Sequence, residues 1–216
     1  RVKGKNFKDF CGKPLFRWVL DTLLSVSDIS TVFINTDARE ILKAHGLEES
    51  DRVKVRDRPL KICGDLVSMN YVIQNDIANV EADIYLMTHT TNPLLSKQSV
   101  ESAIKIFEKS LQENRHDSLF SVNRVQERFY TSDSTPLNHD PNNLIRTQDL
   151  EPWFQENSNL YLFTKQSFEV TGARIGRSPT MLVTAPYEST DIDTPEDWSF
   201  AESVVGYYRE KGVIKA

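Results

Sequence analysis

The sequence predicts an α/β fold, in which helices cover a parallel or mixed sheet. Segments with the pattern of buried strands alternate with segments of helical periodicity along most of the 216 residues, an order typical of such folds. The length suits one domain with a substantial core. Hydrophobic residues make up 39% of the chain and charged residues 26%, which is typical of globular rather than disordered proteins.

Short apolar runs mark the predicted strands, at residues 31–35, 52–56, 84–87, 118–122, 160–163 and 181–185. Apolar residues three or four positions apart mark the predicted helices, at residues 14–24, 38–45, 66–77, 96–111 and 194–208. Gly46 ends the second of these helices, and Ser96 is suited to cap the fourth. The last helix has the clearest start, because Thr194 and Asp197 form a capping box and Pro195 suits the first helical position.

The alternation of strands and helices breaks between Val125 and Asn157. This stretch contains three prolines and several Asn and Asp residues, together with the aromatic residues Phe129, Tyr130, Trp153 and Phe154. It is too long for an ordinary connection and too rich in aromatic residues for a disordered one. We therefore expect an inserted element that packs against another surface, for which a second subunit is a candidate.

The charge pattern argues against a nucleic-acid partner, because the net charge is −5 and the basic residues are spread along the chain. The sequence has no apolar run of membrane-spanning length and no signal peptide, so we expect a soluble, cytoplasmic protein without a membrane partner. Cys11 and Cys63 fit no metal or redox spacing and are expected to be free thiols. The sequence opens at Arg1 in a basic loop without a preceding apolar strand, so we expect that a first strand is missing.

The basic loop at residues 1–6 is a candidate triphosphate site. It carries three cations, among them Lys5, and lies just before a predicted helix. Positive charges can neutralise phosphates there, while backbone N–H groups can approach them at Gly4. A solvated basic terminus would show the same pattern, and the loop alone does not distinguish the two.

Asp191 and Asp193 form a candidate magnesium site. In an extended segment, residues two positions apart point to the same side, so both carboxylates can converge on one cation while Ile192 points into the core. Magnesium is commonly held by one or two carboxylates, and substrate phosphates and water complete its octahedron. The alternative is that Asp193 and Thr194 only cap the last helix.

Further candidate residues follow the predicted strands. Asp37 follows one strand and residues 88–93 follow another, and ligands of open α/β sheets bind beyond the carboxyl ends of strands. Ordinary turns would show the same residues, and His89 is compatible with either interpretation. Arg58 and Asp65 belong to a charged cluster that could contact phosphates or a base, although a surface ion-pair network is an equal alternative.

Taken together and in this order, these segments resemble the acylneuraminate cytidylyltransferases, the family of CMP-sialic acid synthetases. The resemblance covers almost the full chain. Its most specific part is the segment from Ser189 to Asp197, which is similar to the family's SIDIDTPED. The other matching segments are Lys5–Asn6 with residues 12–15, Thr36–Asp37, Arg58–Pro59 with Asp65, residues 91–94 and residues 156–163.

The resemblance implies a Rossmann-like, three-layer nucleotidyltransferase fold with a mixed sheet. Residues 1–216 would form the cytidylyltransferase domain, and residues 125–157 would be an inserted element that makes a homodimer. The implied reaction is the Mg²⁺-dependent transfer of CMP from CTP to the anomeric hydroxyl of a nonulosonic, sialic-acid-like sugar acid, with release of pyrophosphate.

The resemblance also implies roles for single residues. Asp191 and Asp193 would bind Mg²⁺ and, with Lys5, form the catalytic group. Arg58 would help to read the cytosine, and Arg146 would reach the sugar carboxylate in the neighbouring subunit. The complete set of implied substrate-binding residues is Asn6, Asp37, Arg58, Asp65, Thr91, Asn92, Arg146, Gln148 and Asn157.

Several residues depart from the family pattern. His89 and Thr90 stand where the family has Gln-Pro, Asn92 replaces Ser, and Ser158 replaces Gly. Because these positions line the expected sugar pocket, the acceptor stays open, and an octulosonic acid or a phosphonate is an alternative to a nonulosonic acid. A nucleotide-binding protein without catalysis is a different class of function, against which the intact acidic pair argues.

Overall fold

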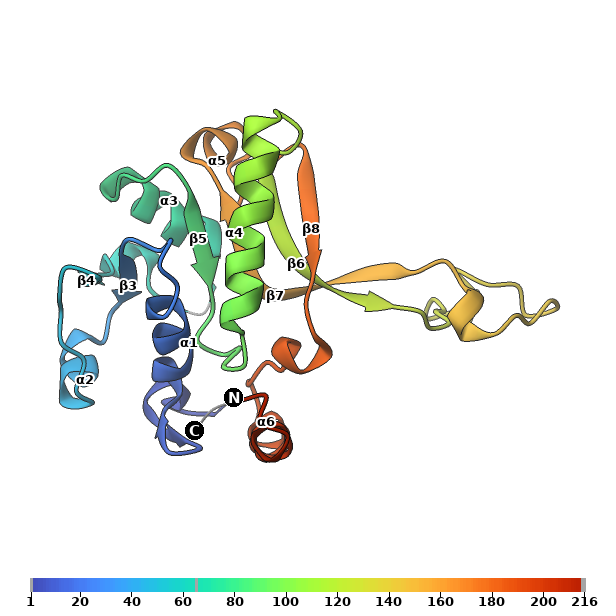
Figure 1. The fold of residues 1–216 in the computed structure, drawn as a ribbon, viewed down its shortest axis with the longest axis horizontal. Coiled ribbons are helices and arrows are strands. Elements are labelled where there is room, and N and C mark those ends of the chain that lie inside the picture. The colour runs from blue at the N-terminus through green and yellow to red at the C-terminus, as the bar shows by residue number, and fades with distance from the viewer. Residues whose placement is uncertain (1, 65, 215–216) are drawn as a thin grey trace.

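The computed structural model describes residues 2–64 and 66–214 (Figure 1). The first half contains the 3₁₀ helices η1 (Lys5–Phe7) and η2 (Leu60–Ile62), the helices α1 (Leu15–Leu24), α2 (Arg39–Ala44) and α3 (Met69–Asn79), and the strands β1 (Asp9–Phe10), β2 (Lys13–Pro14), β3 (Val32–Thr36), β4 (Val53–Asp57) and β5 (Tyr85–Thr88). The second half contains α4 (Lys97–Gln112), β6 (Ser118–Val125), η3 (Thr147–Asp149), β7 (Trp153–Phe163), α5 (Lys165–Thr171), β8 (Pro179–Val183), η4 (Pro186–Ser189) and α6 (Pro195–Glu210). Each strand and helix predicted from the sequence has a counterpart here.

The strands form a mixed sheet, as predicted. Four of them pair in the order β5-β7-β6-β8, in which β7 is antiparallel to both of its neighbours and β8 is parallel to β6. A separate parallel pair is formed by β3 and β4. Alternate residues of β4 are buried, which agrees with the apolar and basic alternation in its sequence.

A cavity of about 1060 Å³ lies between the two groups of strands and is lined by β3, β5, α1 and α3. Within the described ranges, β3 bonds only to β4 and β5 only to β7, so each strand has one edge without a partner strand. An added strand would find unpaired backbone groups at these edges.

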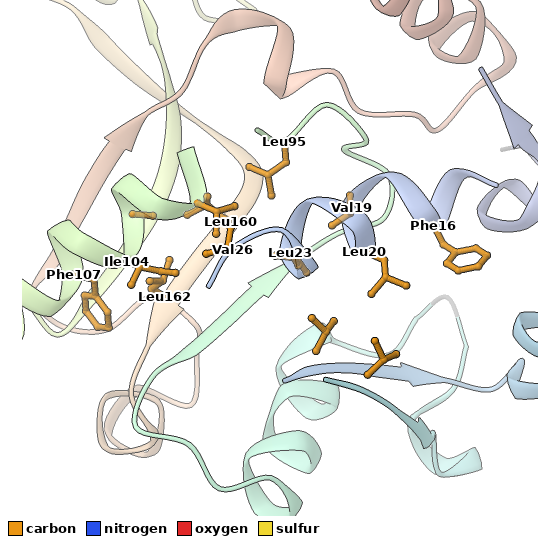
Figure 2. Packing of buried hydrophobic residues seen from close by; sticks show 14 of the residues in the cluster. Phe16, Val19, Leu20, Leu23, Val26, Leu95, Ile104, Phe107, Leu160 and Leu162 are labelled. Carbon is orange, nitrogen blue, oxygen red and sulfur yellow. The ribbon is translucent and has the colours of Figure 1, made fainter. Parts of the chain in front are cut away.

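The main core lies where α1 and α4 pack against each other, with β3 and β4 on the α1 side and β6 and β7 on the α4 side (Figure 2). Its α1 contribution is a buried stripe at helical spacing, formed by Phe16, Val19, Leu20 and Leu23. From the other side come Ile104 and Phe107 of α4 and Leu160 and Leu162 of β7. None of the helices in the described parts of the chain is long and apolar enough to cross a membrane.

A long arm, defined here as residues 123–155, projects from the body of the molecule (Figure 1). The pairing of β6 with β7 is irregular between Phe120 and Val122, and the arm begins beyond this point. At the base of the arm the two strands stay paired, from Asn123↔Gln155 to Val125↔Trp153. The predicted insertion at residues 125–157 therefore overlaps the arm, but its last residues belong to β7. The sequence pattern predicted only the end of this strand, because its first four residues are exposed and only its last five are buried.

Candidate active site

The acidic loop, defined as residues 189–194, presents the two predicted metal ligands on its outer side. Asp191 and Asp193 are exposed, whereas Ile192 is completely buried against residues of α1 and α6. The backbone N–H of Ile192 also donates to the carbonyl of Thr91, at 2.9 Å. The alternation expected from the spacing is therefore present, and it is fixed by a buried anchor.

The cap of α6 follows directly after the acidic loop. The Thr194 hydroxyl accepts from the Asp197 N–H at 3.2 Å, and the Asp197 carboxylate accepts from the N–H groups of Thr194 at 2.8 Å and Asp193 at 3.1 Å. These bonds hold the pKa of Asp197 below its ordinary value. The capping box predicted from the sequence is confirmed, and it uses the backbone of Asp193 but not its carboxylate.

The basic loop lies against the acidic loop. Lys5 Nζ donates to Asp193 Oδ1 at 2.6 Å and to the carbonyl of Ile192, and the N–H of Val2 donates to the carbonyl of Asp193 at 3.0 Å. The Lys5 side chain is 17% exposed, so it is held in place rather than solvated. Two segments almost 190 residues apart in the sequence therefore form one site.

The acidic pair suits magnesium better than a metal that needs a complete protein cage. Among residues 2–64 and 66–214, no group of three or more His, Cys, Asp or Glu side chains could hold a metal ion. Magnesium usually takes only one or two protein carboxylates and completes its shell with phosphate oxygens and water. The exposed carboxylates of Asp191 and Asp193 match this requirement.

Residues from three loops line the large cavity. Its lining includes Lys5 and Asn6 from the basic loop, Arg58 from the segment after β4, and His89 and Thr91 from the segment after β5. The Thr90 hydroxyl donates to the Asn6 side-chain oxygen at 3.2 Å, which joins two of these loops. The structure thus gathers four of the predicted site residues around one space.

Arg58 is fixed by the end of β3. Its Nε donates to Asn35 Oδ1 and its Nη2 to the Asn35 carbonyl, both at 2.8 Å. The Asn35 amide in turn donates to Asp76 at 2.7 Å, and burial raises the pKa of that carboxyl. Of the other residues predicted near the base, Asp37 is exposed beyond β3, and Asp65 lies outside the described residues.

Asn92 and Asn157 have internal positions. Asn92 is completely buried, and no described group bonds to its side-chain oxygen or nitrogen. The Asn157 side chain accepts from the Ser121 hydroxyl at 2.6 Å and donates to the Thr184 hydroxyl at 2.8 Å, so it joins β7 to β6 and to the residue after β8. Their predicted contacts with substrate stay predictions and would require these side chains to change partners.

Arg146 and Gln148 lie on the arm, which extends away from the acidic loop (Figure 1). Arg146 is 79% exposed and forms a bidentate ion pair with Asp149, in which Nε donates to Oδ2 at 2.8 Å and Nη2 donates to Oδ1 at 3.0 Å. The backbone carbonyl of Gln148 accepts from the Gln126 side chain at 3.1 Å. A single chain therefore does not bring Arg146 together with Asp191.

Sequence reasoning missed a cluster centred on Arg174. Its Nη1 contacts His89 Nε2 at 3.3 Å, its Nη2 contacts Glu156 at 3.3 Å, and its guanidinium carbon lies 3.7 Å from the Tyr161 ring centroid. The Tyr161 hydroxyl donates to Glu156, and burial together with this bond raises the pKa of Tyr161 to about 12. Burial, followed by the charge of Arg174, lowers the pKa of His89. Arg174 follows no strand, so only the tertiary structure reveals the cluster.

Curated relatives are found along almost the whole chain. N-acylneuraminate cytidylyltransferase A of Danio rerio is 27% identical over 94% of this chain and 48% of its own length, and the N-acylneuraminate cytidylyltransferase of Oncorhynchus mykiss is 29% identical over the same shares. A pseudaminic acid cytidylyltransferase of Campylobacter jejuni is 25% identical over 94% of this chain and 89% of its own length. The chain therefore spans about half the length of the two fish relatives.

Solved structures share the fold at lower identity. A CMP:2-keto-3-deoxy-manno-octonic acid synthetase complexed with CTP superposes with a TM-score of 0.66 at 14% identity, over 96% of this chain and 94% of that one. A 4-diphosphocytidyl-2C-methyl-D-erythritol synthase of Anaerococcus prevotii reaches 0.67 at 13% identity, over 95% and 92%. The predicted nucleotidyltransferase fold is thereby confirmed. A family model described as "Cytidylyltransferase" matches residues 1–207, and the chain accordingly belongs to the cytidylyltransferase family.

Proposed function

We propose that this protein transfers CMP from CTP to the anomeric hydroxyl of a nonulosonic sugar acid and releases pyrophosphate. The observation that carries the proposal is the contact of Lys5 with Asp193, which joins a cation suited to phosphate to a carboxylate pair suited to magnesium. Family membership supports the cytidylyl group, and the names of relatives that act on acylneuraminic and pseudaminic acids support the acceptor.

Asp191 and Asp193 would hold Mg²⁺, which when bound supplies charge neutralisation at the reacting phosphate. Lys5 and Asn6 would contact the triphosphate from the opposite loop. Catalysis of this kind depends mainly on positioning and charge stabilisation, so held side chains such as Lys5 are well suited to it. Arg58, already fixed by Asn35, would donate to an oxygen of the cytosine without a large ordering cost.

The arm supports a homodimer. It exposes large apolar side chains, which include Tyr130 at 52%, Leu144 at 69%, Trp153 at 39% and Phe154 at 43%. Apolar groups gathered in this way on a projecting element are typical of an interface. In such a dimer, the Arg146 guanidinium would leave Asp149 and form a bidentate contact with the carboxylate of a sugar acid bound by the partner.

Free Cys11 and Cys63 are consistent with a reducing, cytoplasmic compartment.

The test is pyrophosphate release by the full-length protein with Mg²⁺. Each of CTP, UTP, ATP and GTP is combined with sialic, pseudaminic, legionaminic and octulosonic acids. We expect release only from CTP together with a nonulosonic acid. Release with the octulosonic acid alone would replace the proposed acceptor, and no release with any pair would favour a non-catalytic nucleotide-binding protein.

Calorimetry separates base recognition from phosphate recognition. We expect CTP to bind at least roughly tenfold more tightly than UTP, ATP or GTP. A fixed hydrogen-bond donor of the site that finds no acceptor on the wrong base lowers the binding affinity. Equal affinity for all four nucleotides would mean that only the phosphates are recognised. The variant Arg58→Lys keeps the positive charge but loses the bidentate guanidinium. It should reduce the difference in affinity between CTP and the other three nucleotides.

A further inference from the structure

Arg174 meets His89 in a geometry that determines the role of each nitrogen. A guanidinium has only hydrogen-bond donors, so the His89 Nε2 that lies 3.3 Å from Arg174 Nη1 has to be the acceptor. A neutral imidazole carries one proton, which then resides on Nδ1. His89 therefore has a donor at Nδ1, and no described residue accepts from it.

The other contacts of Arg174 hold its guanidinium still. Tyr161 lies beneath the guanidinium plane, and Glu156 accepts from Nη2 on another side. Glu156 is itself held by the Tyr161 hydroxyl. Because Tyr161 and Glu156 together fix the Arg174 head group, it can hold the His89 ring in one orientation.

His89, which carries this donor, is one of the residues that line the large cavity. His89 lines this space together with Thr90 and Thr91, and the charge of Asp191 is near enough to influence it. The acidic loop is anchored to Thr91, two residues from His89, so an acceptor sugar held beside the acidic loop would lie near His89. A neutral N–H is suited to an oxygen ligand and adds no cation that would compete for the acidic loop.

We propose that Arg174 is a positioning residue that fixes His89 as the Nδ1–H tautomer, so that His89 donates to an oxygen of the acceptor sugar acid and helps to determine which acceptor is used. The inference rests on the proposed function for the identity of the ligand. The tautomer itself does not depend on any ligand, so the two statements can fail separately.

The direct test is long-range ¹H–¹⁵N NMR of the His89 ring in the full-length protein without ligands, because the two neutral tautomers give different nitrogen shifts and coupling patterns. We expect the Nδ1–H form in the wild type and loss of this preference in Arg174→Met. Glu156→Gln is the matched control, since it alters the Arg174 cluster but keeps the donor to His89, and it should leave the tautomer unchanged. An Nε2–H tautomer in the wild type would overturn the proposal, even if Arg174→Met failed to fold.

Kinetics test the link to the acceptor through a double-mutant cycle. Arg174→Met and His89→Leu should each raise the KM for the sugar acid roughly tenfold, the typical effect of one lost hydrogen bond, with the KM for CTP unchanged. The double variant should be no worse than either single variant, because Arg174 acts through His89. Additive effects would contradict the positioning role. If the wild type transfers no CMP while its NMR spectrum shows the Nδ1–H form, the proposed function fails but the tautomer assignment stands.

Discussion

The acidic loop and the arm both carry residues expected to handle substrates, but only the acidic loop is held by distant parts of the same chain. Ile192 is completely buried, its backbone bonds to Thr91, and Lys5 bonds across to Asp193. On the arm, Arg146 is 79% exposed and its carboxylate partner is three residues away. Long-range contacts therefore complete the loop that we propose to bind the metal and the phosphates, whereas the ion pair of the arm's arginine joins residues three positions apart.

The largest effect is expected when the acidic loop loses a carboxylate. Asp191→Ala should reduce CMP transfer by about three powers of ten or more, because charge stabilisation of the reacting phosphate would be lost. Its melting temperature should be close to that of the wild type, since Asp191 is exposed. Glu196→Ala is the control: it removes another exposed carboxylate nearby and should retain activity. Near-normal turnover by Asp191→Ala would remove this residue from the catalytic group.

An intermediate effect is expected from the arm. Arg146→Ala should raise the KM for the sugar acid by roughly 10- to 100-fold, the range for a lost charge-assisted hydrogen bond, and leave CTP binding unchanged in calorimetry. Asp149→Ala provides the sharper comparison, because it frees the same arginine from its local partner and should not weaken acceptor binding. If Arg146→Ala weakened CTP instead, the arm would serve the nucleotide.

The elements that the sequence predicted well are those with both a pattern and an end signal. The α6 cap was predictable because Thr194 and Asp197 satisfy each other within one turn. By contrast, α5 has the capping box of Thr164 and Ser167 but is too short for a clear apolar stripe, and it was not predicted. The exposed half of β7 was missed because it is paired by its backbone rather than by burial.

The site shows the same division between local and long-range information. The outward direction of Asp191 and Asp193 follows from strand geometry and was predictable. The internal bonds of Asn157 and the contact of Arg174 with His89 were not, because each joins segments from separate strands or loops. Spacing along the chain contains no information about such partners.

A smaller effect is expected from the cap that supports the acidic loop. Thr194→Ala should destabilise the fold by about 1 kcal/mol, the usual value of an N-cap side chain, and lower the melting temperature by roughly 2–4 °C. Thr194→Ser keeps the acceptor oxygen and should restore most of the loss. A melting temperature of Thr194→Ala equal to that of the wild type would show that the cap contributes little to this end of the molecule.

The smallest effect concerns pH. The pKa of Asp197 is lower in the folded chain than its ordinary value, so its contribution to stability is present above that ordinary value and is lost as the pH falls through the folded value. The stability difference between the wild type and Asp197→Asn, measured by denaturant unfolding, should therefore be larger at pH 7 than in acid. If the stability difference between the two proteins stayed constant across this pH range, the contribution of the cap would not depend on the ionisation of Asp197.

The central claim is that the site is composed of one subunit's acidic loop and the other's arm. Its most direct test is complementation between two variants that are each nearly inactive at limiting sugar acid. Arg146→Ala is mixed with Asp191→Ala under conditions that exchange subunits, and CMP transfer is measured at limiting sugar acid. The control mixture, Asp191→Ala with Asp193→Ala, places both lesions in the acidic loop and should stay inactive. We predict that the first mixture recovers roughly a quarter of wild-type activity at random exchange, because each mixed dimer has one intact site. Mixed dimers that form but recover no activity would contradict the account.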